Sequence, residues 1–162
     1  MQEGSAVPTS KAARVKWTVA FVIWLCIIWG HSLMAGDLSS FESSRFVFLV
    51  RPFFELFGCN DEVLMTFVIR KTAHFSEYAI LAVIAMAMFT SWFGNSRKVV
   101  LLTILVIVAV PCIDEFIQLH VPDRAGAVTD VFLDICGGVF GLAIALLIAH
   151  GQRRSRRGRL TE

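Results

Sequence analysis

The stretch that decides the fold is IDEFIQLHVPDRAGAVTDVFLDICGGVFG, residues 113–141. It joins two apolar runs, residues 99–112 and 135–149, yet it also carries acidic side chains. The acids at or near the apolar runs are Asp114, Glu115, Asp130 and Asp134. A carboxylate at the centre of a membrane-spanning helix costs roughly 2.5–3.5 kcal/mol on insertion scales. We therefore expect these acids to face a protein interior or a watery cavity and to have partners on other helices.

The composition is that of a membrane protein. Of the 162 residues, 56% are hydrophobic and 17% are charged, whereas soluble domains have about 45–50% and about 25%. The apolar residues also gather into long runs instead of alternating with polar ones. The length allows one multi-pass domain and leaves no room for a second folded unit.

Four segments are long and apolar enough to cross a bilayer, for which about 20 residues suffice. They cover residues 17–35, 72–93, 99–118 and 127–150. Residues 46–57 are rich in Phe but contain charges and a proline, so we expect an interfacial or re-entrant helix there. Residues 60–62 resemble the capped start of a new helix that continues into the second span. The predicted fold is an all-α integral membrane protein with four transmembrane helices plus this interfacial or re-entrant segment between the first two.

Lysine and arginine predict the orientation, because cytoplasmic loops carry an excess of both. The tail of residues 1–16, the pair at 97–98 and the arginine-rich tail of residues 151–162 are all basic. They fall on one side when the domain of residues 17–150 has four spans. Residues 33–35 make a poor cleavage site, so we expect the first span to be retained. The prediction is a bacterial inner-membrane protein with both termini in the cytoplasm and the acidic stretch on the extracytoplasmic side.

Three of the spans place polar side chains at the same depth. Residues three and four apart share a helical face, so the second span presents a polar group made of Arg70, Lys71, His74, Glu77 and Tyr78. The third span presents Asp114, Glu115 and Gln118. On the fourth, Asp130 and Asp134 share a stripe with Gly137 and Gly141. Glycines at this spacing allow a neighbouring helix backbone to approach closely, which would bring the polar faces together.

The order of these motifs carries a family resemblance. Arg70-Lys71-x-x-His74-Phe75-x-Glu77-Tyr78, then Asp114-Glu115-x-x-Gln118, then Pro122-x-Arg124, then Asp130 with Gly137 and Gly141 resembles the VanZ-like family of bacterial membrane proteins. The resemblance extends over about residues 32–149. The chain departs from the family pattern at Asp123, where the family usually has Gly, and at Asp134, where it often has Asn.

The VanZ-like family is named for a glycopeptide-resistance accessory protein linked to teicoplanin. The resemblance therefore implies a small multi-helix protein of the cell envelope, associated with antibiotic resistance. For most members no reaction is established, so the resemblance implies a class of protein more than a mechanism.

Our first functional hypothesis is binding of an anionic lipid or cell-wall precursor headgroup, such as a polyprenyl-phosphate-linked sugar. Arg70, Lys71 and Arg124 would contact the phosphate. The side chains that would orient them or bind the rest of the headgroup are His74, Glu77, Tyr78, Asp114, Glu115, Gln118, Asp130 and Asp134. The expected partners are membrane lipids and not nucleic acid, because no aromatic residues are interleaved with the terminal arginines.

Three alternatives belong to other classes. A membrane-embedded hydrolase or transferase would use His74 with Glu77 or Asp114, since histidine changes charge near neutral pH. A small cation or proton carrier would use Asp114, Asp130 and Asp134, although the chain has no internal repeat. A structural role would leave the charges to lock one helix arrangement.

A metal site is a further possibility within the enzyme hypothesis. His74 and Glu77 have the spacing of two ligands on one helix, and Asp114 or Asp130 would complete the set. The chain lacks a His-Glu-x-x-His signature. From sequence we therefore predict no metal and no cofactor.

Overall fold

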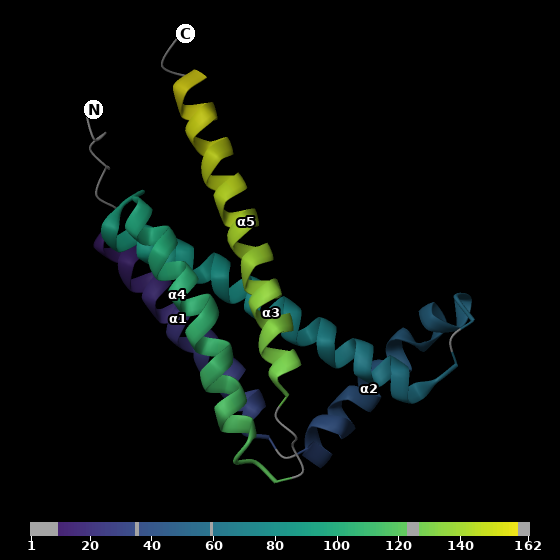
Figure 1. The fold of residues 1–162 in the computed structure, drawn as a ribbon. Helices are drawn as coiled ribbons and strands as arrows, with labels where there is room; N and C mark the ends of the chain where they lie inside the picture. The colour runs from purple at the N-terminus through teal and green to yellow at the C-terminus, as the bar shows by residue number, and fades with distance from the viewer. Residues whose placement is uncertain (1–9, 35, 59, 123–126, 159–162) are drawn as a thin grey trace.

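The computed structural model describes residues 10–34, 36–58, 60–122 and 127–158, without the side chains of 36–45, 153 and 155–158. These residues form five helices and no strand (Figure 1). The helices are α1 (Lys11–Ser32), α2 (Gly36–Leu56), α3 (Glu62–Phe93), α4 (Arg97–Gln118) and α5 (Val128–Gly158).

Four of the five helices are long and apolar enough to cross a membrane: α1, α3, α4 and α5, the last as far as Gln152. Large hydrophobic side chains are exposed along all four, among them Val19, Phe67, Leu105 and Leu147. Exposed apolar surface on this scale marks contact with lipid or another apolar partner. The prediction of an all-α membrane fold with four spanning helices is confirmed, and α2 is the further helix between the first two.

The start of α3 follows from a local sequence signal. The Asp61 side chain accepts hydrogen bonds from the backbone N–H groups of Val63, at 2.9 Å, and Leu64, at 3.2 Å, as an N-cap residue does. From there α3 continues without a break to Phe93. It ends at Gly94, whose φ of 67° lies in the left-handed region that favours glycine. The predicted helix start at residues 60–62 is confirmed.

The α3 helix is the centre of the molecule and packs against the other four helices. Its closest neighbour is α5, because glycines remove the side chains between the two backbones. A Cβ atom at Gly137 would lie 2.3 Å from the carbonyl oxygen of Phe75, and one at Gly141 would lie 2.0 Å from that of Ala79. The predicted close approach of a neighbouring backbone to these two glycines is confirmed.

A second packed region joins α1, α3 and α4. Its buried side chains are Ile28, Tyr78, Leu81 and Val110. The indole N–H of Trp24 on α1 donates a hydrogen bond of 2.9 Å to the backbone carbonyl of Glu77 on α3. These contacts fix the end of α1 beside the middle of α3.

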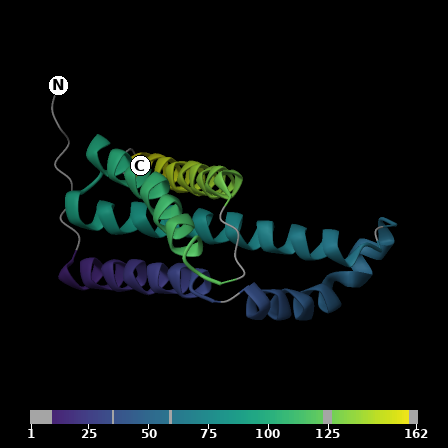
Figure 2. The ribbon, with the colours of Figure 1, turned by 60° about the horizontal axis from the view of Figure 1, so that its bottom comes forward.

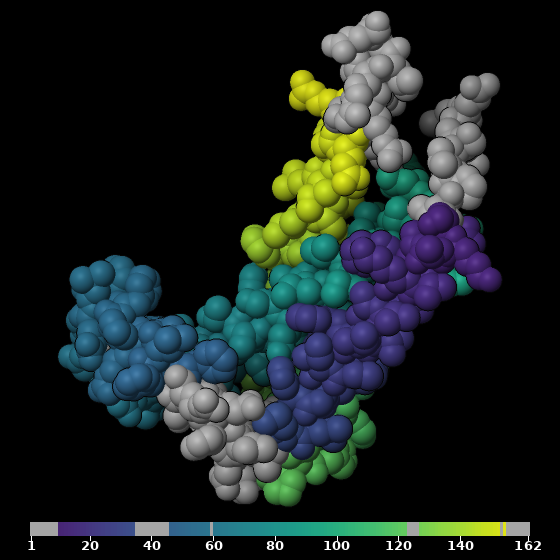
Figure 3. All heavy atoms as spheres, turned by 180° about the vertical axis from the view of Figure 1, so that it is seen from behind, coloured from purple at the N-terminus to yellow at the C-terminus, as the bar shows by residue number. Residues whose placement is uncertain are grey.

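The start of α1 and the end of α5 lie at one end of the bundle, and the polar motifs lie at the other. The first turn of α1 and the last turns of α5 lie at the same end (Figure 1). The end of α1, the end of α4 and the start of α5 lie at the opposite end. In a second view, α1 and α2 follow one another along α3 (Figure 2). From behind, the described part of α2 and the first turns of α3 project from the side of the bundle (Figure 3).

Candidate functional site

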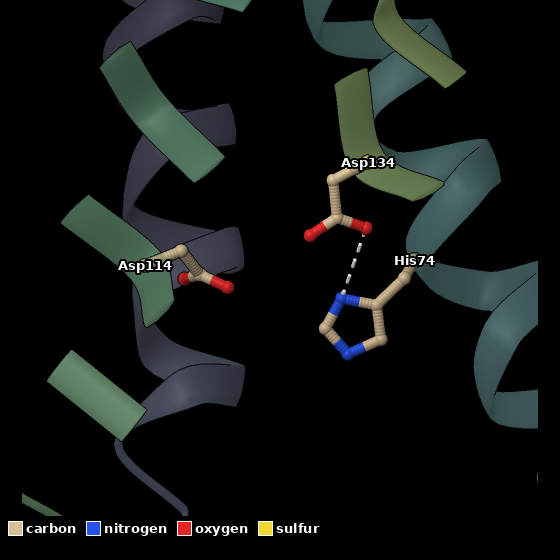
Figure 4. A group of neighbouring side chains, drawn as sticks. All are labelled: His74, Asp114 and Asp134. Atoms are coloured by element: carbon tan, nitrogen blue, oxygen red, sulfur yellow. Dashed lines mark ion pairs between the residues drawn. The ribbon is translucent and has the colours of Figure 1, made fainter. Parts of the chain in front are cut away.

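Three polar side chains from three helices meet inside the bundle. His74 of α3, Asp114 of α4 and Asp134 of α5 point toward one another (Figure 4). One ligand-type atom from each lies within 4.8 Å of the other two. His74 Nδ1 is 3.6 Å from Asp134 Oδ1, while Asp114 is 1% exposed and Asp134 is 2% exposed. We call these three residues the central cluster.

The position of Asp114 is fixed by two neutral donors. The Ser32 hydroxyl, at the end of α1, donates to Asp114 Oδ1. The Gln118 side-chain amide donates to Asp114 Oδ2 at 2.9 Å. The predicted grouping of Asp114 with Gln118 is present, but Ser32 was not foreseen. Its only sequence signal is a hydroxyl residue near the end of an otherwise apolar span.

Two ion pairs link the helices around the central cluster. Lys71 of α3 is paired with Asp130 of α5, and their side chains are 25% and 28% exposed. His31 Nδ1 of α1 lies 2.8 Å from Glu77 Oε1 of α3, an ion pair when the histidine is protonated. Glu77 is therefore engaged with α1 and is not one of the three residues that form the central cluster.

Several buried polar atoms at this end of the bundle have no hydrogen-bond partner among the described residues. They are the Tyr78 hydroxyl, Glu115 Oε1, and the facing atoms His74 Nδ1 and Asp134 Oδ1, whose separation of 3.6 Å is that of an ion pair but too long for a hydrogen bond. Tyr78 is 1% exposed, and its hydroxyl lies near the carboxyl groups of Asp114 and Asp134. Glu115 lies near Asp114, Asp130 and Asp134. Buried polar groups in folded proteins nearly always have partners, so this concentration of unpaired atoms is unusual.

Two basic residues of the predicted site have no described partner. Arg70 is half-buried, next to Lys71 in the chain, and makes no ion pair with the described side chains. Arg124 lies outside the described residues. Nothing in the described geometry therefore places Arg124 at the site.

Acidic side chains outnumber basic ones at the assembled site. Asp114 and Asp134 are buried beside a single imidazole, and Glu115 adds a further carboxyl group nearby. Lys71 is already paired with Asp130. Chemically, this arrangement is suited to holding a cation or a shared proton, and His74 beside a carboxylate has the pairing of a general base.

These features define a multi-pass helical membrane protein with a buried polar site at one end of its bundle. The VanZ/LLP1 family model matches residues 17–149 of the chain, which therefore belongs to the VanZ/LLP1 family. The comparisons with curated proteins and with solved structures found no match.

Proposed function

We propose that this protein binds the headgroup of an anionic envelope lipid, with a phosphate group at Lys71. The headgroup chemistry is that of a polyprenyl-phosphate-linked cell-wall precursor. The observation that carries this proposal is the Lys71–Asp130 pair, which joins α3 to α5 and remains partly exposed. An incoming phosphate would compete with Asp130 for the ammonium group through a charge-assisted hydrogen bond.

Two arginines join Lys71 in this proposal. Arg70 is included because it is next to Lys71 in the chain and makes no ion pair with the described side chains. Arg124 is included on sequence grounds alone. It belongs to the short connection between α4 and α5, shortly before Asp130 in the chain. Asp130 and Gln118 would then bind sugar or peptide groups of the same ligand.

The proposed orientation places this site on the extracytoplasmic side of a bacterial inner membrane. The first turn of α1 and the last turns of α5 lie at the end of the bundle opposite to the polar site. That end carries basic residues of α1, α4 and α5, among them Lys11, Arg97 and Arg154, and the positive-inside rule assigns such an end to the cytoplasm. Cell-wall precursors are used on the extracytoplasmic side of the membrane, which an outward-facing site would meet. A role in glycopeptide resistance, which the family resemblance suggests, would act there.

Native mass spectrometry of the protein purified with bacterial lipids tests the headgroup proposal. We expect wild type to retain a phosphate-bearing lipid and Lys71→Met to lose it. Asp130→Asn breaks the same ion pair, leaves the lysine free and keeps an amide that can hydrogen-bond the headgroup, so it should retain at least as much lipid as wild type. Arg51→Ala on α2 removes a basic residue elsewhere and is the matched control. Equal retention by wild type, Lys71→Met and Arg124→Ala would refute the proposal.

A second candidate function is supported by the His74–Asp134 contact. A half-buried imidazole 3.6 Å from a carboxylate has the arrangement of a general base oriented by an acid, as a hydrolase or transferase requires. This candidate predicts that His74→Ala abolishes turnover of a bound lipid while the lipid is still retained. Loss of lipid and turnover together would assign His74 to binding instead.

A further inference from the structure

We propose that His74, Asp114 and Asp134 bind one divalent transition-metal ion of the Mn²⁺ or Zn²⁺ class. The site lies where α3, α4 and α5 meet (Figure 4). The donor set is one imidazole nitrogen and two carboxylate oxygens. Imidazole suits zinc and its neighbours, whereas carboxylate also suits manganese. This site goes beyond the proposed headgroup binding and does not depend on it.

The spacing of the three donor atoms fits a shared ion. Ligand atoms at about 2.1–2.2 Å from one tetrahedral metal ion are about 3.4–3.6 Å apart. The three donor atoms lie within 4.8 Å of one another, so the longest separation needs to close by at most about 1.4 Å. The separation of 3.6 Å between His74 Nδ1 and Asp134 Oδ1 already lies in the required range.

The charge of the central cluster favours a cation. Asp114 and Asp134 are both almost fully buried, and buried carboxylates that lack a positive partner are costly. Ser32 and Gln118 are neutral donors to Asp114, and Lys71 is engaged with Asp130. A divalent ion would balance the charge of the two central carboxylates. The hydrogen bonds of Ser32 and Gln118 and the ion pair of Lys71 would all be kept.

An independent observation comes from Tyr78, which is not one of the three proposed ligands. Its hydroxyl is buried near Asp114 and Asp134 and faces the Asp114 carboxylate without forming a hydrogen bond of normal geometry. Three protein ligands leave an open coordination position, as in catalytic zinc sites. An oxygen atom bound at that position would be a natural acceptor for the Tyr78 hydroxyl.

The residues behind Asp114 complete the description of a built site. Metal-ligating side chains are usually oriented by outer hydrogen bonds. Ser32 donates to one oxygen of Asp114, and Gln118 donates to the other. Each carboxylate oxygen has two acceptor sites, so Asp114 can accept both bonds and still bind a metal.

A metal ion would also offset the negative charge of the carboxylates near the proposed phosphate site. The carboxylates of the central cluster repel an anionic headgroup, whereas a bound divalent ion attracts it. The ion and Lys71 would then supply positive charge from α3 and its neighbours toward the same phosphate.

Titration of the delipidated, tag-free protein with Mn²⁺ tests this inference, with free Mn²⁺ followed by electron paramagnetic resonance. Manganese is the better probe because the described cysteines 26, 112 and 136 are free and thiolates attract zinc. We expect one Mn²⁺ per chain, displaced by Zn²⁺. Affinity should fall at least tenfold in Asp134→Asn and in His74→Gln.

Matched controls separate a ligand effect from a general one. Glu62→Gln makes the acid-to-amide change at an exposed position on α3, and His120→Gln removes an exposed histidine in the turn that follows α4. Both should bind Mn²⁺ within twofold of wild type. All variants are compared by size-exclusion profile and thermal stability.

The metal proposal is overturned if wild type binds neither Mn²⁺ nor Zn²⁺ at millimolar concentration. It is also overturned if well-folded Asp134→Asn or His74→Gln binds Mn²⁺ as wild type does. The first of these tests uses wild type alone, so it remains decisive even if a variant fails to fold. Metal binding without lipid retention would refute the headgroup proposal alone, and the reverse result would refute the metal site alone.

Discussion

The two halves of α3 lie in opposite surroundings. In the first half, side chains such as Val63 and Phe67 are exposed, although Met65 is buried, and α2 is a principal neighbour. In the second half, α3 is enclosed by α1, α4 and α5, and Tyr78 and Leu81 are almost completely buried.

Small residues explain much of the difference between the halves. Ala79 of α3 faces Gly141 of α5, and Phe75 faces Gly137 with its backbone carbonyl. Close backbone approach increases van der Waals contact, which drives helix association in lipid, where the hydrophobic effect contributes little. The polar site begins where this packed half begins, at Lys71 and His74. Tight packing and the buried charges therefore belong to the same region of the molecule.

The largest expected effect comes from filling the gap between α3 and α5. Gly141→Ala places a Cβ atom against the backbone of Ala79, and overpacking of this kind costs typically about 1–3 kcal/mol, occasionally more. We expect a marked fall in the midpoint of denaturation in detergent. Gly30→Ala is the control, since a Cβ there meets nothing within 4 Å. Equal stability of the two variants would mean that α5 is not held against α3 as described.

A smaller effect is expected from one hydrogen bond in the packed half. Ser32→Ala removes the hydroxyl that donates to buried Asp114. Buried hydrogen bonds between membrane helices contribute about 0.6 kcal/mol on average and about 1.7 kcal/mol at most. Because the acceptor is a buried carboxylate, we expect a loss of about 1–2 kcal/mol, measured by denaturant titration. Ser76→Ala, which removes an exposed hydroxyl bonded to its own helix, should change stability by less. A larger loss in Ser76→Ala would contradict this assignment.

The smallest effect is expected in the exposed half. Arg51 of α2 pairs with Glu55 at 3.0 Å and with Glu62 of α3 at 3.1 Å. All three side chains are exposed, and surface pairs contribute about 0–1 kcal/mol. Arg51→Ala should therefore leave the denaturation midpoint nearly unchanged. If it destabilised the protein as much as Ser32→Ala does, the contrast between the two halves of α3 would fail.

Much of the fold could be predicted from sequence because long apolar runs, caps and glycines act locally. Asp61 caps its own helix, and the spacing of Gly137 and Gly141 identifies one face of one helix. The helix before α3 was predicted less well. Residues 46–57 were predicted from their Phe content, whereas α2 begins at Gly36 and ends at Leu56. Residues 36–45 are mostly polar, so an apolar run cannot indicate helix there.

The partners within the site could not be predicted, for a physical reason. Helical periodicity shows which residues share a face, but it does not determine how each helix is rotated toward its neighbours. Glu77 could have completed a set with His74 on the same helix, yet it contacts His31 of α1. Asp134, which departs from the family pattern, is the residue that His74 meets.

The length of α3 has a consequence for where the central cluster lies in the bilayer. The helix has 32 residues and is therefore about 48 Å long, whereas the hydrocarbon core is about 30 Å thick. His74 lies about 28 Å along the axis from Phe93. If Phe93 lies at the cytoplasmic boundary, an upright helix carries His74 to the outer boundary, and a tilted one leaves it deeper. If the proposed lipid headgroup reaches the cluster, bilayer thickness would set how far it must descend, and hydrophobic mismatch would tune its access.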